Sequence, residues 1–220
     1  MIKHIIFDFD DTLSDFQRAK ELSKQKITPY LEEKGINTAA YWAYYEAIFE
    51  PLFSRYVNHE LTVNEYRLMR FEHNGINRAE AAEFNKIYLN TVNKAFLFED
   101  VEPVLKILKQ RGYRLYVLTN GPSVQRTKIE ACAVGNLFEA LFISSELGVG
   151  KPSSDVYRLV LSKLNAAPEE VMMVGDSYEN DCVAAEGNGI LAVQINRHNK
   201  LITDYHNQIE TLHDIFTYLS

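Results

Sequence analysis

Short apolar runs rich in β-branched residues recur along the chain, and longer stretches with helical periodicity separate them. These runs predict five strands, at Lys3–Phe9, Arg114–Thr119, Leu141–Ser144, Val171–Val174 and Leu191–Ile195. Strands that alternate with helices are typical of a parallel sheet that helices cover on both faces. The pattern therefore predicts an α/β fold.

A long segment between the first two predicted strands, from Asp15 to about Phe98, has helical stretches and no strand pattern. Residues that end or interrupt helices punctuate it, at Gly35, Pro51, Asn58 and Gly75. We expect residues 15–98 to form an inserted helical cap domain. The remaining residues, 1–14 and 99–220, are expected to form the catalytic core domain.

The chain after this segment returns to the core pattern. An apolar stripe predicts a helix over Val101–Gln110, which Gly112 stops. The tail, Thr211–Leu219, predicts a short amphipathic closing helix.

Charge and hydropathy exclude several classes of function. A net charge of −7 without any run of Lys or Arg argues against binding to a nucleic acid polymer. No apolar stretch approaches the ~20 residues that span a bilayer, and the Ile5–Phe7 run meets Asp8 too early for a signal peptide. We expect no membrane partner, a cytoplasmic location, and a monomer or homodimer. The two cysteines, Cys132 and Cys182, have no metal-ligand spacing and are expected to be reduced.

Polar residues collect directly after the predicted strands. Ligands of open parallel sheets bind beyond the carboxyl ends of the strands, so these residues are expected to converge. They are Asp8, Asp10 and Asp11 after the first strand, Thr119, Asn120 and Gly121 after the second, Lys151 after the third, and Asp176 and Asp181 after the fourth.

Crowded carboxylates repel one another and normally require a cation. An oxygen-only ligand set favours Mg²⁺, held by Asp8, Asp176 and a backbone carbonyl, whereas the lack of His and Cys ligands disfavours zinc. A metal beside an aspartate, with a lysine and a hydroxyl–amide pair opposite, suits phosphoryl transfer. Asp8 would then be the nucleophile and Asp10 the general acid and base.

Four segments, DFDDT, LTNG, GVGKP and GDSYEND, resemble the four motifs of the haloacid dehalogenase superfamily, in order and over nearly the whole chain. The resemblance implies a Rossmann-like parallel sheet with the inserted helical cap of the superfamily's first subclass. It also implies site roles for individual residues. Asp8 would be the nucleophile, Asp10 the acid and base, Thr119 and Lys151 phosphate ligands, Asp8, Asp176 and the Asp10 carbonyl the Mg²⁺ ligands, and Asp181 a residue beside the metal ligands.

Dehalogenases of this superfamily lack the second aspartate, so the presence of Asp10 and Asp176 favours phosphate chemistry. Two segments, PLFSRYVNHELTVNEYRLMRFEHNGI and LTNGPSVQRTKIE, look most like the pyrimidine 5′-nucleotidase group. We therefore expect a Mg²⁺-dependent phosphatase that acts on a small phosphorylated metabolite, a nucleoside 5′-monophosphate. The alternatives are a phosphoglycolate or sugar-phosphate phosphatase, a phosphomutase, and a phosphate-binding module without activity.

Some of these residues also have structural explanations. The chain departs from the superfamily pattern at Asp11, where Gly is usual, and at Asn188, where Ala is usual; we interpret Asp11 as a turn or helix-start residue. Thr119 and Asn120 could end a strand and form a turn, but the backbone N–H groups of Asn120 and Gly121 near a helix start favour phosphate contact. Aromatic residues of the segment 41–49 could form a platform that stacks on a nucleotide base, but packing in the core of a cap helix is favoured. Cys182 is also expected to pack in a core.

Overall fold

The computed structural model describes residues 1–198 and 205–219. Its internal contacts divide the chain into two compact units. The core unit comprises Met1–Phe16 and Ala95–Ser220, and the helical unit comprises Gln17–Lys94. The boundaries predicted from the sequence lie after residues 14 and 98.

A six-stranded parallel sheet forms the centre of the core unit, in the order β3-β2-β1-β4-β5-β6. This arrangement confirms the predicted fold class. The strands are β1 (His4–Phe7), β2 (Arg114–Thr119), β3 (Ala140–Ile143), β4 (Val171–Gly175), β5 (Leu191–Ile195) and β6 (Gln208–Ile209). The sequence analysis did not predict β6, because a strand of two residues is too short to show an alternating pattern. It also extended β1 too far, since Asp8 and Phe9 follow the strand.

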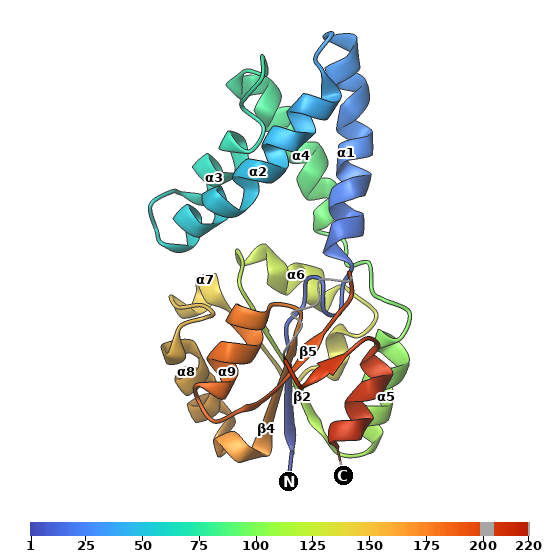
Figure 1. Ribbon diagram of the computed structural model, residues 1–220, viewed down its shortest axis with the longest axis vertical. Helices are drawn as coiled ribbons and strands as arrows, with labels where there is room; N and C mark the ends of the chain where they lie inside the picture. The colour runs from blue at the N-terminus through green and yellow to red at the C-terminus, as the bar shows by residue number, and fades with distance from the viewer. Residues whose placement is uncertain (199–204, 220) are drawn as a thin grey trace. The chain divides into compact units, whose positions relative to one another are not determined.

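Helices cover both faces of this sheet (Figure 1). The α-helices of the core unit are α5 (Val101–Gln110), α6 (Val124–Glu130), α7 (Ser144–Leu147), α8 (Ser154–Leu164) and α9 (Ala184–Glu186). As predicted, α5 ends before Gly112, whose φ of 88° suits only a residue without a side chain. The predicted closing helix is a 3₁₀ helix, η4 (Leu212–Tyr218), rather than an α-helix. Further 3₁₀ turns are η1 (Gly135–Leu137) and η2 (Pro168–Glu170), and η3 (Tyr178–Val183) is a π-helical turn.

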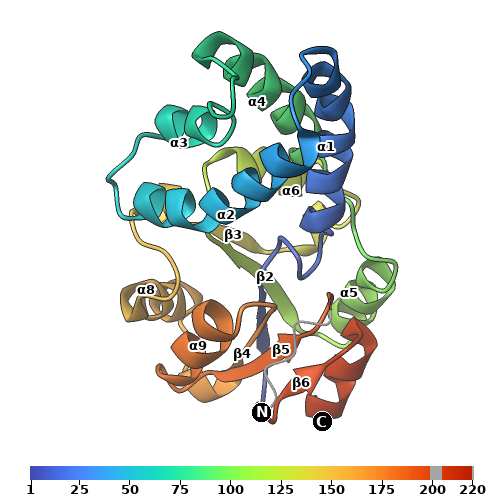
Figure 2. The same cartoon turned by 45° about the horizontal axis from the view of Figure 1, so that its top comes forward.

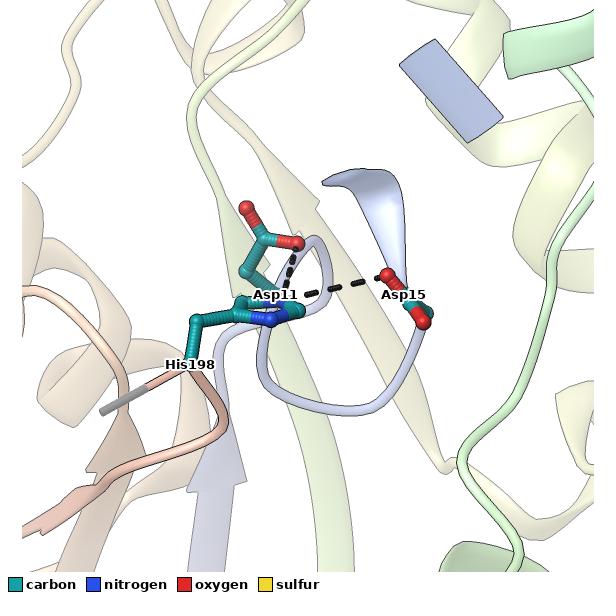
Figure 3. Close-up of side chains that lie close together, drawn as sticks. All are labelled: Asp11, Asp15 and His198. Atoms are coloured by element: carbon teal, nitrogen blue, oxygen red, sulfur yellow. Dashed lines mark hydrogen bonds and ion pairs between the residues drawn. The ribbon is translucent and has the colours of Figure 1, made fainter. Parts of the chain in front are cut away.

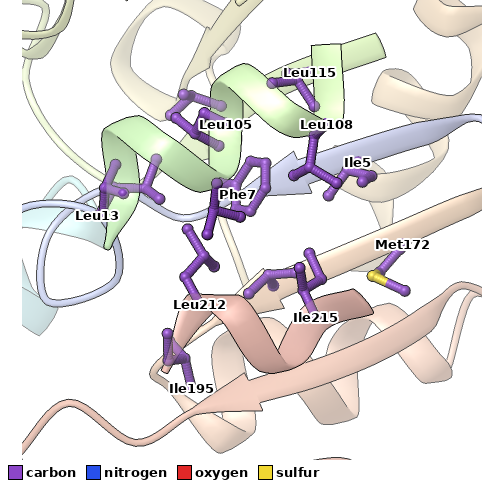
Figure 4. Close-up of a cluster of buried hydrophobic side chains, with 14 of the residues drawn as sticks. Ile5, Phe7, Leu13, Leu105, Leu108, Leu115, Met172, Ile195, Leu212 and Ile215 are labelled. Carbon is purple, nitrogen blue, oxygen red and sulfur yellow. The ribbon is translucent and has the colours of Figure 1, made fainter. Parts of the chain in front are cut away.

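Alternate residues of the strands point to two hydrophobic clusters, one on each face of the sheet. Figure 4 shows the first, in which Ile5 and Phe7 of β1 pack against Leu105 and Leu108 of α5 and Ile215 of η4. The second joins the opposite face of the strands to α8 and η3 through residues such as Ile6, Val156 and Cys182. Cys182 is fully buried, which confirms the prediction that it packs in a core, and this burial raises the pKa of its thiol to about 12.

Four helices make up the helical unit: α1 (Phe16–Glu33), α2 (Thr38–Val57), α3 (Val63–Met69) and α4 (Arg78–Val92) (Figure 2). Asn37, Thr62 and Asn77 cap the last three with side-chain oxygens. The prediction that Pro51 interrupts a helix is wrong, because α2 continues through it. An interior proline costs about 3 kcal/mol, and packing of the buried Tyr41, Tyr45 and Leu52 on the same helix offsets this cost.

Two aromatic residues of α2 pack inside the helical unit, as predicted, whereas Tyr44 is 48% exposed. Tyr41 and Tyr45 are fully buried, and the Tyr41 ring stacks on the His73 ring with centroids 4.2 Å apart. Arg70 is also buried, with its guanidinium 4.3 Å from the Tyr88 ring centroid. None of the helices formed by the described residues has the length and apolar character needed to cross a membrane.

Candidate active site

Asp8 lies at the centre of the sheet, at its carboxyl edge. Strand β1 pairs with β2 on one side and β4 on the other, so the residue after β1 is flanked by both strand ends. The Asp8 N–H donates to the carbonyl of Val174 in β4 at 2.8 Å, which extends this pairing by one residue. Phe7 and Phe9 on either side are fully buried and fix the position of Asp8. The site residues therefore meet around Asp8.

A tight turn follows β1. The N–H groups of Leu13 and Ser14 both donate to the Phe9 carbonyl, at 2.9 Å each. Asp11 takes a left-handed conformation with φ of 60°, and its Oδ1 accepts a hydrogen bond from the Phe16 N–H at 2.9 Å. Asp11 is thus a turn and helix-start residue, as predicted. The imidazole of His198 faces the carboxylates of Asp11 and Asp15 in Figure 3, with Nε2 3.2 Å from Asp11 Oδ1.

Lys151 connects two of the predicted site aspartates. Its Nζ donates to Asp8 Oδ1 and to Asp181 Oδ1, at 2.6 Å in each case. The Lys151 side chain is only 3% exposed. Burial alone would lower the pKa of the ammonium, but Asp181 and Asp8 raise it well above its ordinary value, so Lys151 is charged.

Asp176 completes a cluster of three carboxylates. Asp8, Asp176 and Asp181 place carboxylate oxygens within 4.8 Å of one another. Burial, and then the neighbouring carboxylates, raise the pKa of Asp176 to about 8, and burial raises that of Asp8 to about 7. Once Asp8 and Asp176 lose their protons, the single ammonium of Lys151 leaves negative charge in this cluster uncompensated. An all-oxygen group with excess negative charge fits a divalent cation such as Mg²⁺.

The π-helical turn η3 holds Asp181 in place. The Ser177 N–H donates to Asp181 Oδ2 at 3.1 Å, and the Tyr157 hydroxyl donates to the Asn180 carbonyl at 2.6 Å. Asp181 is 1% exposed. Its carboxylate therefore orients Lys151.

The segment after β2 contacts the Lys151 backbone through the side chain of Asn120. The Asn120 side chain forms two hydrogen bonds with the Lys151 backbone, donating to its carbonyl at 2.7 Å and accepting from its N–H at 2.9 Å. The Gly121 N–H donates to Ser144 Oγ at 2.9 Å. Asn120 thus positions Lys151 through its amide. Thr119 is buried at the carboxyl end of β2, next to β1.

Asp10 lies beside α6. Its Oδ1 accepts from Lys128 Nζ at 2.5 Å and its Oδ2 accepts from Gln125 Nε2 at 2.6 Å. Among the predicted site residues, Asp8, Lys151, Asp176 and Asp181 form one cluster. Asp10 faces a separate pair of side chains.

The sequence analysis gave no role to the residues that support this site. Gln125 and Lys128 are three positions apart, so they lie on the same face of α6, directly after the LTNG segment. Two long polar side chains on one helix face, next to a motif at a strand end, are a sequence signal that could have predicted residues supporting the site. Tyr157 offered a weaker one, because an aromatic residue inside an apolar helix face is normally read as core.

Comparisons with known proteins identify related chains. A family model described as haloacid dehalogenase-like hydrolase matches residues 2–189. A pyrimidine 5′-nucleotidase, PynA of Streptococcus pneumoniae, is 25% identical over 223 residues that cover 98% of this chain and 92% of that protein. A glyceraldehyde 3-phosphate phosphatase of Pyrococcus abyssi is 31% identical over 196 residues, which cover 88% of this chain and 81% of that protein.

The fold also has a counterpart among solved structures. The HAD-hydrolase YfnB from Bacillus subtilis, solved with bound magnesium, superposes with a TM-score of 0.81 at 23% identity. The match covers 100% of this chain and 99% of that one.

Proposed function

The chain belongs to the haloacid dehalogenase-like hydrolases, and from this premise we propose that it is a Mg²⁺-dependent phosphatase that hydrolyses small phosphomonoesters through an aspartyl-phosphate on Asp8. The observation that carries the proposal is the contact between Lys151 and Asp8 inside a cluster of three carboxylates. A nucleophilic carboxylate, a buried ammonium and an oxygen-rich cation site are the parts that phosphoryl transfer requires. Phosphatase relatives of similar length support the same chemistry.

The proposed reaction has two displacements. In the first, an Asp8 carboxylate oxygen attacks phosphorus, the bond from phosphorus to the leaving oxygen breaks, and Asp10 donates a proton to that oxygen. In the second, Asp10 takes a proton from a water molecule that attacks the aspartyl-phosphate. Phosphate then leaves and the Asp8 carboxylate is restored.

The remaining residues bind and orient the phosphoryl group. Asp8, Asp176 and the Asp10 carbonyl would hold Mg²⁺, which when bound neutralises charge on phosphoryl oxygens. Lys151 and the Thr119 hydroxyl would contact phosphoryl oxygens, together with the backbone N–H of Asn120. The Gly121 N–H donates to Ser144 and would have to change partner to do the same.

A nucleoside 5′-monophosphate is the substrate class we propose. The likeness to the pyrimidine 5′-nucleotidase PynA extends over 98% of the chain and so includes the helical unit. We propose that this unit is the cap domain and selects the substrate. The likeness to a glyceraldehyde 3-phosphate phosphatase, at 31% identity, makes a triose or sugar phosphate the second candidate.

The test is phosphate release with Mg²⁺ from nucleoside monophosphates, sugar phosphates, glyceraldehyde 3-phosphate and phosphoglycolate, compared by kcat/KM. Asp8→Asn is the matched blank, because it keeps the size of the side chain and removes the nucleophile; we expect a loss of at least ~10³-fold. A preference for pyrimidine monophosphates supports the nucleotidase. A near-native rate in Asp8→Asn would contradict the assignment of Asp8 as the nucleophile. Equal kcat/KM values across the panel, or higher values for sugar phosphates, would reject nucleoside monophosphates as the substrate class.

A further inference from the structure

Both oxygens of the Asp10 carboxylate are engaged by side chains of one helix. Lys128 Nζ lies 2.5 Å from Oδ1 and Gln125 Nε2 lies 2.6 Å from Oδ2. Two donors on opposite oxygens define the plane of the carboxylate as well as its position. A carboxylate oxygen has a second lone pair, which can take a proton that is exchanged with substrate or water.

Lys128 is not an ordinary surface lysine. Its side chain is 3% exposed, and the rings of Phe9 and Phe16 lie 5.4 and 5.5 Å from its ammonium. Burial of an ammonium is costly unless a partner compensates for the lost water. In the part of the chain that the structure describes, Asp10 is the carboxylate that forms an ion pair with Lys128. The Asp10 side chain is 22% exposed, so burial of the Lys128 ammonium beside it carries a desolvation cost. An apolar contact between α6 and the turn after β1 would join the two elements without this cost.

We propose that Lys128 and Gln125 are positioning residues that hold the Asp10 carboxylate in the orientation needed to exchange a proton with the leaving-group oxygen. This inference rests on the proposed phosphatase reaction and assigns a role to two residues outside the four motifs. The proton transfer depends on distance and angle to the leaving oxygen. Without the two donors, Asp10 would rotate about χ1 and χ2 and spend less time aligned.

The experiment compares two leaving groups in each variant. p-Nitrophenyl phosphate releases a stable phenolate that hardly needs a proton, whereas the best alkyl phosphate of the substrate panel releases an alkoxide that does. The value of kcat/KM reports steps up to departure of this group. In Lys128→Met we expect kcat/KM to fall about 100-fold for the alkyl ester and less than about 5-fold for the nitrophenyl ester. The ratio between the two substrates does not depend on how much of the variant is folded.

Three further variants make the interpretation specific. Lys128→Arg keeps a cation at this position and should retain most of the kcat/KM for the alkyl ester. Gln125→Leu should show the same selective loss for the alkyl ester as Lys128→Met, on a smaller scale. Arg126→Met is the matched control, because Arg126 sits on the same helix and pairs with Glu146 at the surface. It should leave both rates unchanged.

Two results would overturn the proposal, and they differ from a failure of the phosphatase assignment. An equal loss for both esters in Lys128→Met would mean that the ion pair is only structural. Failure of Lys128→Arg to recover the alkyl-ester rate would contradict the need for a cation. A wild-type protein that turns over no phosphate ester would instead reject the proposed function itself.

Discussion

At the scale of single residues, Asp11 shows how the turn after β1 is built. Its φ of 60° lies in the left-handed region, which L-residues avoid at a cost of about 1–2 kcal/mol, although Asp and Asn tolerate it best. The Asp11 side chain offsets this cost because its Oδ1 accepts the Phe16 N–H at the start of α1. Asp11 therefore adopts the positive φ of the turn and also caps α1. A glycine at this position would adopt the positive φ but has no side chain to form the cap.

This combination leads to a prediction for two substitutions. Asp11→Ala loses both the tolerance for positive φ and the hydrogen bond to Phe16, so we expect the free energy of unfolding to fall by about 2 kcal/mol. Asp11→Asn keeps an oxygen acceptor and the tolerance for positive φ, and should stay within about 0.5 kcal/mol of wild type. Urea denaturation followed by circular dichroism measures both. Equal stability of the two variants would show that neither the turn nor the cap depends on this side chain.

The convergence of the predicted aspartates was expected because the DFDDT and GDSYEND segments stand at the carboxyl ends of β1 and β4, which are neighbours in the sheet. Asp8, Asp176 and Asp181 converge for that reason. The partners of Asp10 were not predictable, since Lys128 is 118 positions away and the contact depends on how α6 packs. The engagement of Asn120 with the Lys151 backbone was missed for the same reason. Sequence patterns place residues on elements, whereas packing decides which side chains meet.

At the scale of elements, the end of β4 and the turn η3 approach each other closely. A Cβ added at Gly175 would lie 2.2 Å from Asp181 Oδ2 and 2.3 Å from Asp181 Cγ. Gly175 therefore provides the space in which η3 folds back and brings Asp181 to Lys151. The π-helical turn adds one residue to a helical turn, a feature often found at functional sites.

Gly175→Ala is expected to displace the Asp181 carboxylate and to break its contact with Lys151. A buried charge without its partner is destabilising, so we expect a loss of about 2–4 kcal/mol in the free energy of unfolding, measured by urea denaturation. Gly187→Ala is the matched control, since its added Cβ would meet the nearest atom at 3.3 Å and its φ of −60° is ordinary. It should change stability by less than about 0.5 kcal/mol. A native-like Gly175→Ala would mean that η3 can shift without cost.

Elements were predictable to different degrees. Arg114–Thr119 and Val101–Gln110 have their predicted bounds because each carries a complete apolar pattern. The helix through Pro51 was not predictable, since packing across α2 outweighs a local helix breaker. The two-residue β6 carries too little pattern for any prediction.

At the scale of the whole molecule, the protein carries buried charge that a bound cation would stabilise. The ordinary pKa of an aspartate here is 3.8, whereas burial raises that of Asp8 to about 7 and that of Asp176 to about 8. Between pH 3.8 and these raised pKa values, Asp8 and Asp176 keep their protons in the folded protein but have lost them in the unfolded chain. The metal-free protein therefore loses stability as the pH rises from about 4 to about 8.

Magnesium should reverse this loss, because it binds the deprotonated carboxylates of the folded state alone. At a concentration 100-fold above Kd, the expected stabilisation is about 2.7 kcal/mol, which raises Tm by about 5–10 °C in a chain of this size. We expect the increase at pH 8 and little change at pH 5, where Asp8 and Asp176 are protonated. Thermal unfolding of EDTA-treated protein at both pH values, with and without Mg²⁺ at equal ionic strength, measures the difference.

Asp176→Asn provides the control for this thermal shift. It removes one metal ligand and one titrating carboxylate, so its Tm should respond little to Mg²⁺ and depend less on pH than that of wild type. Without metal, it should also be more stable than wild type at pH 8, since Asp8 then faces less negative charge. The same Mg²⁺ shift at pH 5 and pH 8, or an unchanged shift in Asp176→Asn, would show that the cation binds elsewhere. That result would remove the charge argument for a metal at the centre of the sheet and leave Lys151 as the group that neutralises Asp8.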